Sequence, residues 1–443
     1  MKNLRNTSLL AIAALGVMTT HANAQQGNFY DREKYEAVKD RYQPDFDPEV
    51  VRAGAFIVDS DLTIGVEATD NVFAANGNAA NPEESDTIFS AALDVNARTD
   101  WSVHEVGLRG RLGRDEYSDF SDESFTDLSL GASGRLDVSR EFNVGANVGY
   151  QDTVQSRANF VNGAQLDSPI EFTRSSFAVS ANYQNERIRL NNTLQLIQSD
   201  FDDGEFRGTN TVFDQDFRDS DYVNLTSRLS YAISPNVAVF GQGTLSQTDY
   251  DSTQTFTVTD PNTGVTTVET RTRDSDGYIA AAGLNFETTN LMRGDIAVGF
   301  FSEDKKDSAF DDVDGVSVDG QLEFFPSRLT TVTLDAGRRV VDNGLIDSPS
   351  TLQTRLGATV DHEFSRQIVG SVFANYTEDD YQEVARKDDF TQFGVSGTYK
   401  LNKRLHLTGF VQSTERDANT GVGNAFDPSF SANEVGIALS IFP

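Results

Sequence analysis

The 443-residue sequence contains no cysteine. This absence excludes a disulfide scaffold, and it also excludes lipid attachment to a cysteine behind a signal sequence. Zinc sites built on thiolates are excluded as well, and the four histidines are too scattered along the chain to replace them. We therefore predict no metal site and no cofactor.

Basic residues and long apolar runs are also scarce. Lysine and arginine number 36 against 68 aspartates and glutamates, which gives a formal net charge of −32. Such a chain has little basic surface to neutralise phosphates, so nucleic-acid partners are excluded. After the N-terminal region, no stretch approaches the length of about 18 apolar residues that a membrane-spanning helix needs, and we expect no such helix.

The N-terminus has the order of a secretory signal peptide. Lys2 and Arg5 precede an apolar run from Leu9 to Met18, and Ala22-Asn23-Ala24 supplies small residues at its end. This order predicts a signal peptide over residues 1–24, with cleavage after Ala24. A membrane-anchoring helix is the poorer alternative, because the apolar run is only about ten residues long.

Residues 25–52 form a polar segment that we expect to be a periplasmic tail. Tyr35, Val38 and Tyr42 have helical spacing, which indicates one short helix before Pro44. The alternative is that this segment forms a small plug or an arm that docks on a partner.

The stretch from Phe56 to Thr69 alternates with a period of two. Leu62, Ile64 and Val66 fall on one face, whereas polar side chains such as Asp61 fall on the other. A period of two predicts an extended strand, because successive side chains point to opposite faces. The stretch exceeds the roughly 5–6 residues of an ordinary strand, and it is long enough to cross a bilayer at a tilt.

The same alternation returns along the chain, interrupted by connections of two kinds. Short turns are predicted at eight places: Thr99-Asp100, Ser139-Arg140, Asn185-Glu186, Pro235-Asn236, Thr289-Asn290, Pro326-Ser327, Ser365-Arg366 and Asn402-Lys403. Longer polar loops are predicted at nine: 71–86, 115–124, 152–170, 200–220, 250–275, 303–313, 340–349, 378–386 and 416–431. The sequence therefore predicts an all-β fold, a transmembrane antiparallel up-and-down barrel of about 18 strands over residues 53–443. Its short turns and both termini should lie in the periplasm and its longer loops outside the cell.

One loop differs from the others. Residues 253–273 are β-prone on both sides of a turn at 260–264, which predicts a hairpin that projects above the membrane. A loop folded inward as a constriction is the alternative.

Charges of both signs are predicted to face the lumen of this barrel. They are Asp59, Asp61, Glu67, Asp94, Arg98, Glu105, Arg109, Arg111, Arg135 and Arg355, together with Arg189, Arg228, Asp319, Glu323 and Asp361. Opposed charges across an aqueous pore would create a transverse field that orients dipolar solutes. The alternative is that these charges fill the lumen wall with salt bridges.

Motifs that carry enzyme chemistry are missing. The signatures of a nucleophile elbow, a zinc protease and a phosphate-binding loop do not occur. His104, His362 and His406 lie near predicted short turns, at the periplasmic rim, so we expect no catalytic residue.

Two acidic loops, 200–204 and 311–315, suggest calcium but do not match a calcium-binding loop. Ser199 and Phe310 occupy the position of its first oxygen ligand. We interpret the carboxylates of these loops as groups that keep the exposed loops soluble. The alternative is that they bridge to lipopolysaccharide through divalent cations.

Three motifs lie between Pro44 and Phe73. They are Asp45, Asp47 and Pro48, then Arg52, Gly54 and Phe56, and finally Asp70-Asn71-Val72-Phe73. In these motifs the chain resembles the start of the putative beta-barrel porin 2 family of bacterial outer-membrane proteins. The resemblance implies an outer-membrane barrel and a link, seen in several relatives, to exopolysaccharide production or export. It implies no catalytic residue and does not fix the solute.

We therefore expect a non-enzymatic channel or conduit in the cell outer membrane, associated with exopolysaccharide export. The alternatives are a general diffusion porin for small polar solutes, an outer-membrane hydrolase and a closed surface scaffold. The expected partners are outer-membrane lipid and lipopolysaccharide, the barrel assembly machinery and polysaccharide export components.

Overall fold

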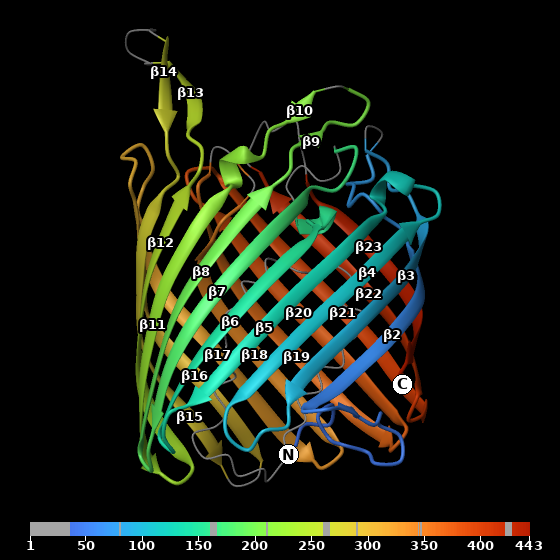
Figure 1. Cartoon of the computed structure of the whole chain (residues 1–443). Coiled ribbons are helices and arrows are strands. Elements are labelled where there is room, and N and C mark those ends of the chain that lie inside the picture. Colours follow the sequence, from blue (N-terminus) through green and yellow to red (C-terminus); the bar gives the residue numbers. More distant parts are fainter. Residues whose placement is uncertain are drawn as a thin grey trace.

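A computed structural model describes residues 36–78, 81–159, 166–209, 211–259, 266–288, 291–343, 345, 348–420 and 428–443 of the chain. Figure 1 shows one closed barrel of tilted strands. Among the described residues, no helix is long and apolar enough to cross a bilayer. The predicted signal peptide and residues 25–35 of the predicted tail lie outside the described residues.

Eighteen long antiparallel strands form the barrel. They are β2 (Phe56–Thr69), β3 (Asp86–Thr99), β4 (Glu105–Tyr117), β5 (Phe125–Asp137), β6 (Phe142–Val154), β7 (Glu171–Gln184), β8 (Ile188–Phe201), β11 (Ser220–Ser234), β12 (Val237–Tyr250), β15 (Ser275–Thr288), β16 (Met292–Lys305), β17 (Val313–Ser327), β18 (Thr330–Val341), β19 (Thr351–Ser365), β20 (Ile368–Tyr381), β21 (Arg386–Asn402), β22 (Leu405–Asn419) and β23 (Phe430–Ile441). The predicted fold and strand number are confirmed.

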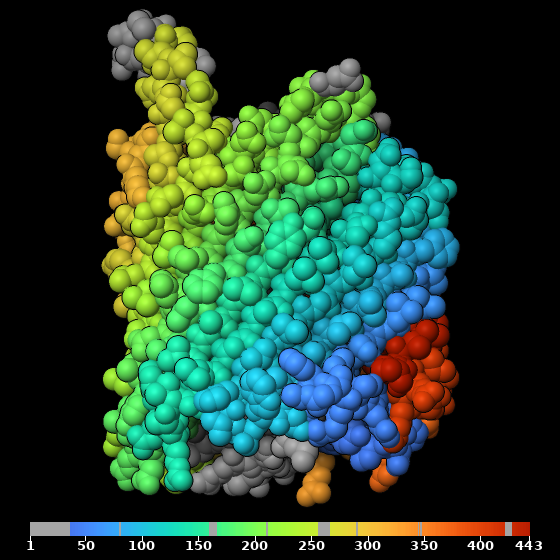
Figure 2. All heavy atoms as spheres, in the orientation of Figure 1, coloured from blue at the N-terminus to red at the C-terminus, as the bar shows by residue number. Residues whose placement is uncertain are grey.

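The first and last long strands close the ring. β2 pairs with β23 from Leu62 opposite Ile441 to Thr69 opposite Glu434. Beside the lower part of β2 lies the short strand β1 (Val51–Ala53), whose Ala53 is opposite Phe56. Figure 2 shows the C-terminal end of the chain beside the N-terminal part of the barrel wall.

Short connections lie at one end of the barrel, which we call the short-turn end, and long ones at the other, the long-loop end (Figure 1). Seven of the eight predicted turns fall within described residues, and the turn at Thr289-Asn290 lies outside them. The predicted turn at Pro326-Ser327 is displaced to residues 328–329, because a bulge between Phe324 and Ser327 carries β17 past the proline. The predicted loop 378–386 shrinks to 382–385, because β20 and β21 pair as far as Tyr381 and Arg386.

The long-loop end carries small elements of its own. They are η1 (Ser121–Glu123), η2 (Arg157–Asn159), β9 (Gly204–Glu205), β10 (Val212–Phe213), η4 (Asp216–Arg218), β13 (Gln254–Thr259) and β14 (Thr266–Arg271). β13 and β14 form the predicted hairpin, and it projects above the barrel (Figures 1 and 2). Its turn at 260–264 lies outside the described residues.

The outer surface of the barrel is apolar and is rimmed by aromatic side chains. Leu62, Ile64 and Val66 of β2 are exposed there, and the other long strands also expose large apolar side chains. Near the short-turn end, Tyr231 and Phe364 are exposed. Exposing such an apolar surface to water would be unfavourable, whereas contact with lipid is favourable. The alternation of the strands therefore produces a membrane-facing belt.

Candidate functional site

The interior face of the barrel is identified by an ion pair that crosses it. The Nη1 atom of Arg228 on β11 donates to Oδ1 of Asp295 on β16 at 3.1 Å. β12 and β15 lie between these strands in the sheet. Side chains on non-adjacent strands of a closed, convex wall can meet only on its inner side, so Arg228 and Asp295 point inward. Residues opposite each other in an antiparallel sheet share a face, and the register extends this assignment around the ring.

Ten of the residues that the sequence predicts to face the lumen fall on this inner face. Asp61 is opposite Asp94, Asp94 is opposite Arg111, and the row continues from strand to strand to Ser220 on β11, an even number of residues from Arg228. By strand alternation the same face holds Asp59, Glu67, Arg98, Glu105, Arg109 and Arg135. In the other direction around the ring, Asp295 is opposite Gln321 on β17, and Asp319 lies two residues away on the same face. Asp319 is opposite Gly337 on β18, which in turn is opposite Arg355 on β19.

Several of these charges pair with residues on a neighbouring strand or on their own strand. Arg111 Nη1 lies 2.6 Å from Asp94 Oδ2 on β3, and Arg135 Nη1 lies 3.8 Å from Glu105 Oε2 on β4. Arg135 Nε also lies 3.2 Å from Asp137 Oδ1 on its own strand, β5. Opposite charges therefore meet within the wall on β3, β4 and β5, as the salt-bridge alternative expects. Glu67 differs, since it is buried and neither of its carboxylate oxygens has a hydrogen-bond partner among the described residues.

Other interior side chains are exposed to solvent although they lie inside the ring. They include Asn96, Arg98, Arg109, Ser133, Asn147, Asp319, Gln321, Asp335 and Arg355. These residues lie on β3 to β6 on one side and on β17 to β19 on the other. Polar side chains are therefore accessible inside the ring on both sides.

Residues 36–50, which we call the rim segment, lie against the interior of the short-turn end. The backbone N–H of Val38 donates to Thr331 Oγ1 at 3.0 Å, and Lys39 Nζ lies 3.0 Å from Asp361 Oδ1. Further along, Lys400 Nζ donates to Asp47 Oδ1 at 2.5 Å. The rim segment thus covers the inner ends of β18 to β21.

No helix occurs in the rim segment, in contrast to the expectation from the spacing of Tyr35, Val38 and Tyr42. Tyr35 lies outside the described residues, and turns occupy residues 38–40 and 44–47. Individual bonds to the barrel hold this segment, and Pro44 and Pro48 restrict the residues before them to extended backbone. Local helical spacing is overridden by these contacts.

At the long-loop end, the described residues 342–343 and 348–350 between β18 and β19, which we call the inward loop, contact side chains of other loops inside the ring. Asp342, the first residue after β18, accepts a hydrogen bond from the Tyr250 hydroxyl at the end of β12, at 2.9 Å. It also accepts one from Arg273 Nη2 at 2.7 Å. Three strands, β15 to β17, separate β12 from β18 in the sheet, so this contact lies on the inner side of the ring.

The inward loop was not predicted from the sequence, which offered 253–273 as its candidate constriction. The bonds that define the loop join residues 69 and 92 positions apart, Arg273 and Tyr250 with Asp342. No local pattern marks such partners. The buried Ser348 and Ser350 are small polar residues of the kind found in any loop.

The opposite side of the long-loop end is held by a buried ion pair. Arg157 Nε donates to Glu123 Oε2 at 2.6 Å, and Arg157 Nη1 donates to the carbonyl of Leu166 at 3.0 Å. Burial raises the pKa of Glu123, and Arg157 opposes that shift. Phe73 packs edge-on against Phe120 nearby, with ring centroids 4.8 Å apart. These contacts tie three loops together.

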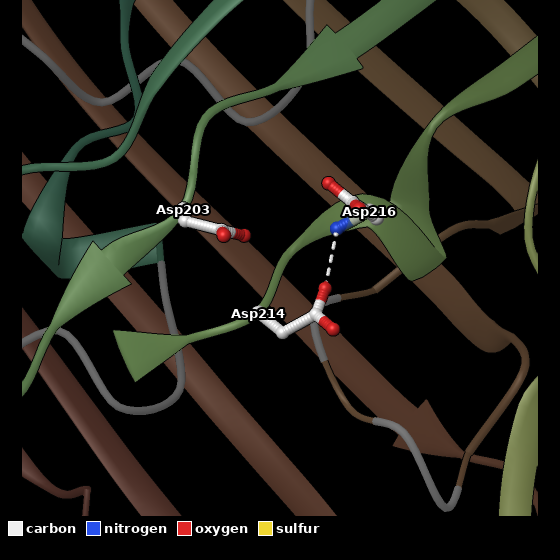
Figure 3. A group of neighbouring side chains, drawn as sticks. All are labelled: Asp203, Asp214 and Asp216. Carbon is white, nitrogen blue, oxygen red and sulfur yellow. Dashed lines mark hydrogen bonds between the residues drawn. The ribbon is translucent and has the colours of Figure 1, made fainter. Parts of the chain in front are cut away.

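Three exposed aspartates gather in the loop between β8 and β11 (Figure 3). Oxygen atoms of Asp203, Asp214 and Asp216 lie within 4.8 Å of one another. Asp214 accepts the backbone N–H of Asp216 at 3.0 Å, and Asp203 accepts that of Gln215 at 2.8 Å. The Asp214 carboxylate raises the pKa of Asp216. These bonds are turn contacts, and we assign no ion to the cluster.

The three histidines that the structure describes lie near the short-turn end, beside different strands. His104 Nδ1 accepts the N–H of Asp137 at 3.0 Å in the turn before β4. His362 contacts Thr330 Oγ1 at 2.9 Å, and His406 Nε2 lies 3.0 Å from the carbonyl oxygen of Phe46. Each is accounted for by a structural contact.

Among curated proteins, none matches this chain in sequence. Solved structures of similar shape include OpdK of Pseudomonas aeruginosa with vanillate (10% identity, TM-score 0.45, 87% of this chain and 99% of that chain). A BenF-like porin of Pseudomonas fluorescens Pf-5 is 11% identical (TM-score 0.45, 87% and 99%). A mutant ferric enterobactin receptor PfeA of Pseudomonas aeruginosa is 7% identical (TM-score 0.46, 89% and 81%). A family model described as putative beta-barrel porin 2 matches residues 43–441, which include every barrel strand.

Proposed function

The chain belongs to the putative beta-barrel porin 2 family, and we propose that it is a passive conduit associated with exopolysaccharide export. It is an outer-membrane β-barrel with porin-like architecture. The observation that carries the proposal is the hydrated interior, in which Asn96, Arg109 and Arg355 are exposed. We assign the short-turn end to the periplasm and the long-loop end to the cell exterior, the usual orientation of such barrels.

An amide ladder on the inner wall supports a hydroxyl-rich solute. Asn182 Nδ2 donates to Asn143 Oδ1 at 3.0 Å, and Asn191 Nδ2 donates to Asn182 Oδ1 at 2.8 Å. Side-chain amides offer both donors and acceptors, as sugar hydroxyls do. Mixed charges on β3 to β5 extend this polar wall.

The proposal includes processing and partners. The signal peptide is removed after Ala24, and the mature chain is inserted by the barrel assembly machinery. Its apolar belt contacts outer-membrane lipid, and its acidic loops face lipopolysaccharide. Polysaccharide export components deliver polymer to the short-turn end, beside the rim segment. No catalytic group takes part.

Planar bilayers test conduction directly. Purified protein is expected to give stepwise conductance, because the exposed interior residues provide a hydrated path. Oligosaccharide added to one side should lower that conductance, since it occupies the same path. The measurement is single-channel current with and without the oligosaccharide. A bilayer that stays silent after verified insertion would contradict the conduit and favour a closed scaffold.

Ion selectivity tests whether the inner wall is the path. Arg355→Glu is expected to move the reversal potential in a salt gradient toward cation preference, because the exposed interior cation becomes an anion. The matched control is Arg114→Glu, since Arg114 points outward on β4 and pairs with Glu116 at 2.7 Å. Equal shifts in both variants would show that surface charge, rather than the lumen wall, sets the current.

The polysaccharide association has its own test. Deletion of the gene should reduce secreted polymer while leaving uptake of small polar solutes unchanged. The reverse result would favour the general diffusion porin.

A further inference from the structure

Basic groups from three segments converge on Asp342 of the inward loop. Arg273 Nη2 lies 2.7 Å from Asp342 Oδ1, and Arg218 Nε lies 4.0 Å from Asp342 Oδ2. Arg174 on β7 is close enough to both Arg218 and Asp342 to affect their electrostatics. The Tyr250 hydroxyl donates to the same carboxylate. We call Arg218, Arg273 and Tyr250 the mouth cluster.

The two arginines of the mouth cluster are buried, whereas their carboxylate ligand is accessible. The side chains of Arg273 and Arg218 are 1% and 3% exposed, but that of Asp342 is 34% exposed. An accessible carboxylate on a loop can leave and be replaced from solvent. The two guanidinium groups are enclosed by the packed loops of the long-loop end, so they stay in place when the carboxylate leaves.

Positive charge exceeds negative charge at this place. Burial lowers the pKa of Arg218 to about 10, with Arg273 and Arg174 lowering it further and Asp342 opposing the shift. Nε and Nη1 of Arg273 have no hydrogen-bond partner among the described residues, although the side chain is buried. A buried donor left unpaired is costly, so the cluster has capacity for more oxygen atoms than Asp342 supplies.

We propose that the mouth cluster binds the carboxylate of an acidic solute, and that Asp342 is an internal ligand which this carboxylate displaces. Guanidinium forks bind carboxylates through two parallel hydrogen bonds, and the tyrosine hydroxyl adds a third donor. Arg273 Nη2 also donates to the carbonyl oxygens of Asn343 and Pro349, each at 3.2 Å, so a solute carboxylate that occupies Nη2 takes this donor away from the inward loop as well. The proposal rests on the proposed function in one respect, that a solute reaches the long-loop end.

Calorimetry of the detergent-solubilised full chain tests the binding site without requiring conduction. Glucuronate is the carboxylate probe and glucose the neutral control. Asp342→Ala is expected to bind glucuronate roughly ten-fold or more tightly than the wild type, because it removes a competitor held by charged hydrogen bonds. Arg273→Ala should lose this binding. Asp251→Ala, which removes an exposed carboxylate from the same end, should match the wild type.

Inorganic phosphate and sulfate form a third arm, since they share the oxyanion chemistry. Glucuronate tighter than either anion supports a carboxylate site, whereas tighter phosphate or sulfate overturns the assignment to carboxylates. Equal affinity of glucuronate for wild type and Asp342→Ala, or binding that survives Arg273→Ala, overturns the internal-ligand proposal.

A second measurement avoids dependence on variants that fold poorly. In the wild type, glucuronate should speed amide hydrogen exchange at residues 348–351, and glucose should not, because the freed loop loses its bonds to Arg273. Unchanged exchange at saturating glucuronate overturns the displacement step. Loss of conductance with glucuronate binding intact would instead contradict the proposed function, so the two failures are distinguishable.

Discussion

Replacing Asp388 by asparagine is expected to lower the free energy of unfolding of the barrel by about 3–5 kcal/mol, the usual effect of breaking a buried ion pair. Asp388 is 1% exposed on the inner face of β21. Arg386 Nε and Nη2 donate to it at 2.9 and 2.5 Å, and Arg416 Nε and Nη2 donate to it at 3.0 and 2.5 Å. Without its charge, two buried guanidinium groups lose their shared counterion.

Urea unfolding of the protein in lipid vesicles measures this loss, with the single tryptophan, Trp101, as the fluorescent reporter. The matched control is Asp389→Asn, the next residue, which points outward. Asp389 Oδ1 accepts one hydrogen bond, from the Tyr376 hydroxyl at 2.6 Å. The side-chain oxygen of asparagine can still accept this bond, so Asp389→Asn should cost no more than about 0.5–1.5 kcal/mol, the contribution of an ordinary hydrogen bond. Similar losses in the two variants would contradict the role given to the buried cluster.

Replacing Lys400 by alanine is expected to release the rim segment. Lys400 and Asp47 have side chains only 12% and 7% exposed, so the substitution leaves the Asp47 carboxylate buried without its cation. Such a loss costs about 3 kcal/mol or more, which shifts the ratio of docked to undocked segment by roughly a hundred-fold. Tryptic cleavage after Lys39 and Arg41 should accelerate, because undocking also frees their bonds to Asp361 and Glu363.

The neighbouring pair Lys403–Glu49 provides the control. These side chains lie 2.5 Å apart but are exposed, 40% and 71% respectively. Water and salt screen exposed pairs, so Lys403→Ala should leave the cleavage rate near that of the wild type. Release of the segment by Lys403→Ala to the same extent as by Lys400→Ala would show that burial does not decide the docking.

The strands could be predicted because each one encodes its own two faces. Phe56–Thr69 was predicted as a strand and is β2 with the same bounds. Alternation needs no knowledge of the partner strand, and turn residues mark where it stops. The displaced turn after β17 shows the limit of this signal. A proline usually ends a strand, but a bulge accommodates Pro326 inside the last residues of β17.

The candidate site was predictable only where partners lie on adjacent strands. The phase of β3 and β4, joined by a short turn, already places Asp94 and Arg111 on one face. The pair Arg228–Asp295 depends on the curvature of the closed ring, and the Asp342 contacts depend on a loop that folds inward. Neither curvature nor loop direction is encoded in local alternation. The same holds for the contacts of the rim segment.

The position of the rim segment also determines an order of assembly. The segment runs from Lys400 on β21 and from His406 on β22 to β1, which pairs with β2. It therefore passes the end of β23, the strand that joins β22 to β2. The rim segment thus bridges the joint between the first and last long strands, β2 and β23.

The bonds Lys400–Asp47 and His406–Phe46 join residues 353 and 360 positions apart in the chain. Contacts of such long range form late, because the intervening chain must first be ordered. The rim segment is consequently expected to be among the last parts of the chain to dock. We expect the rim segment to dock after the ring has closed. We also expect it to detach before the joint between β2 and β23 can reopen.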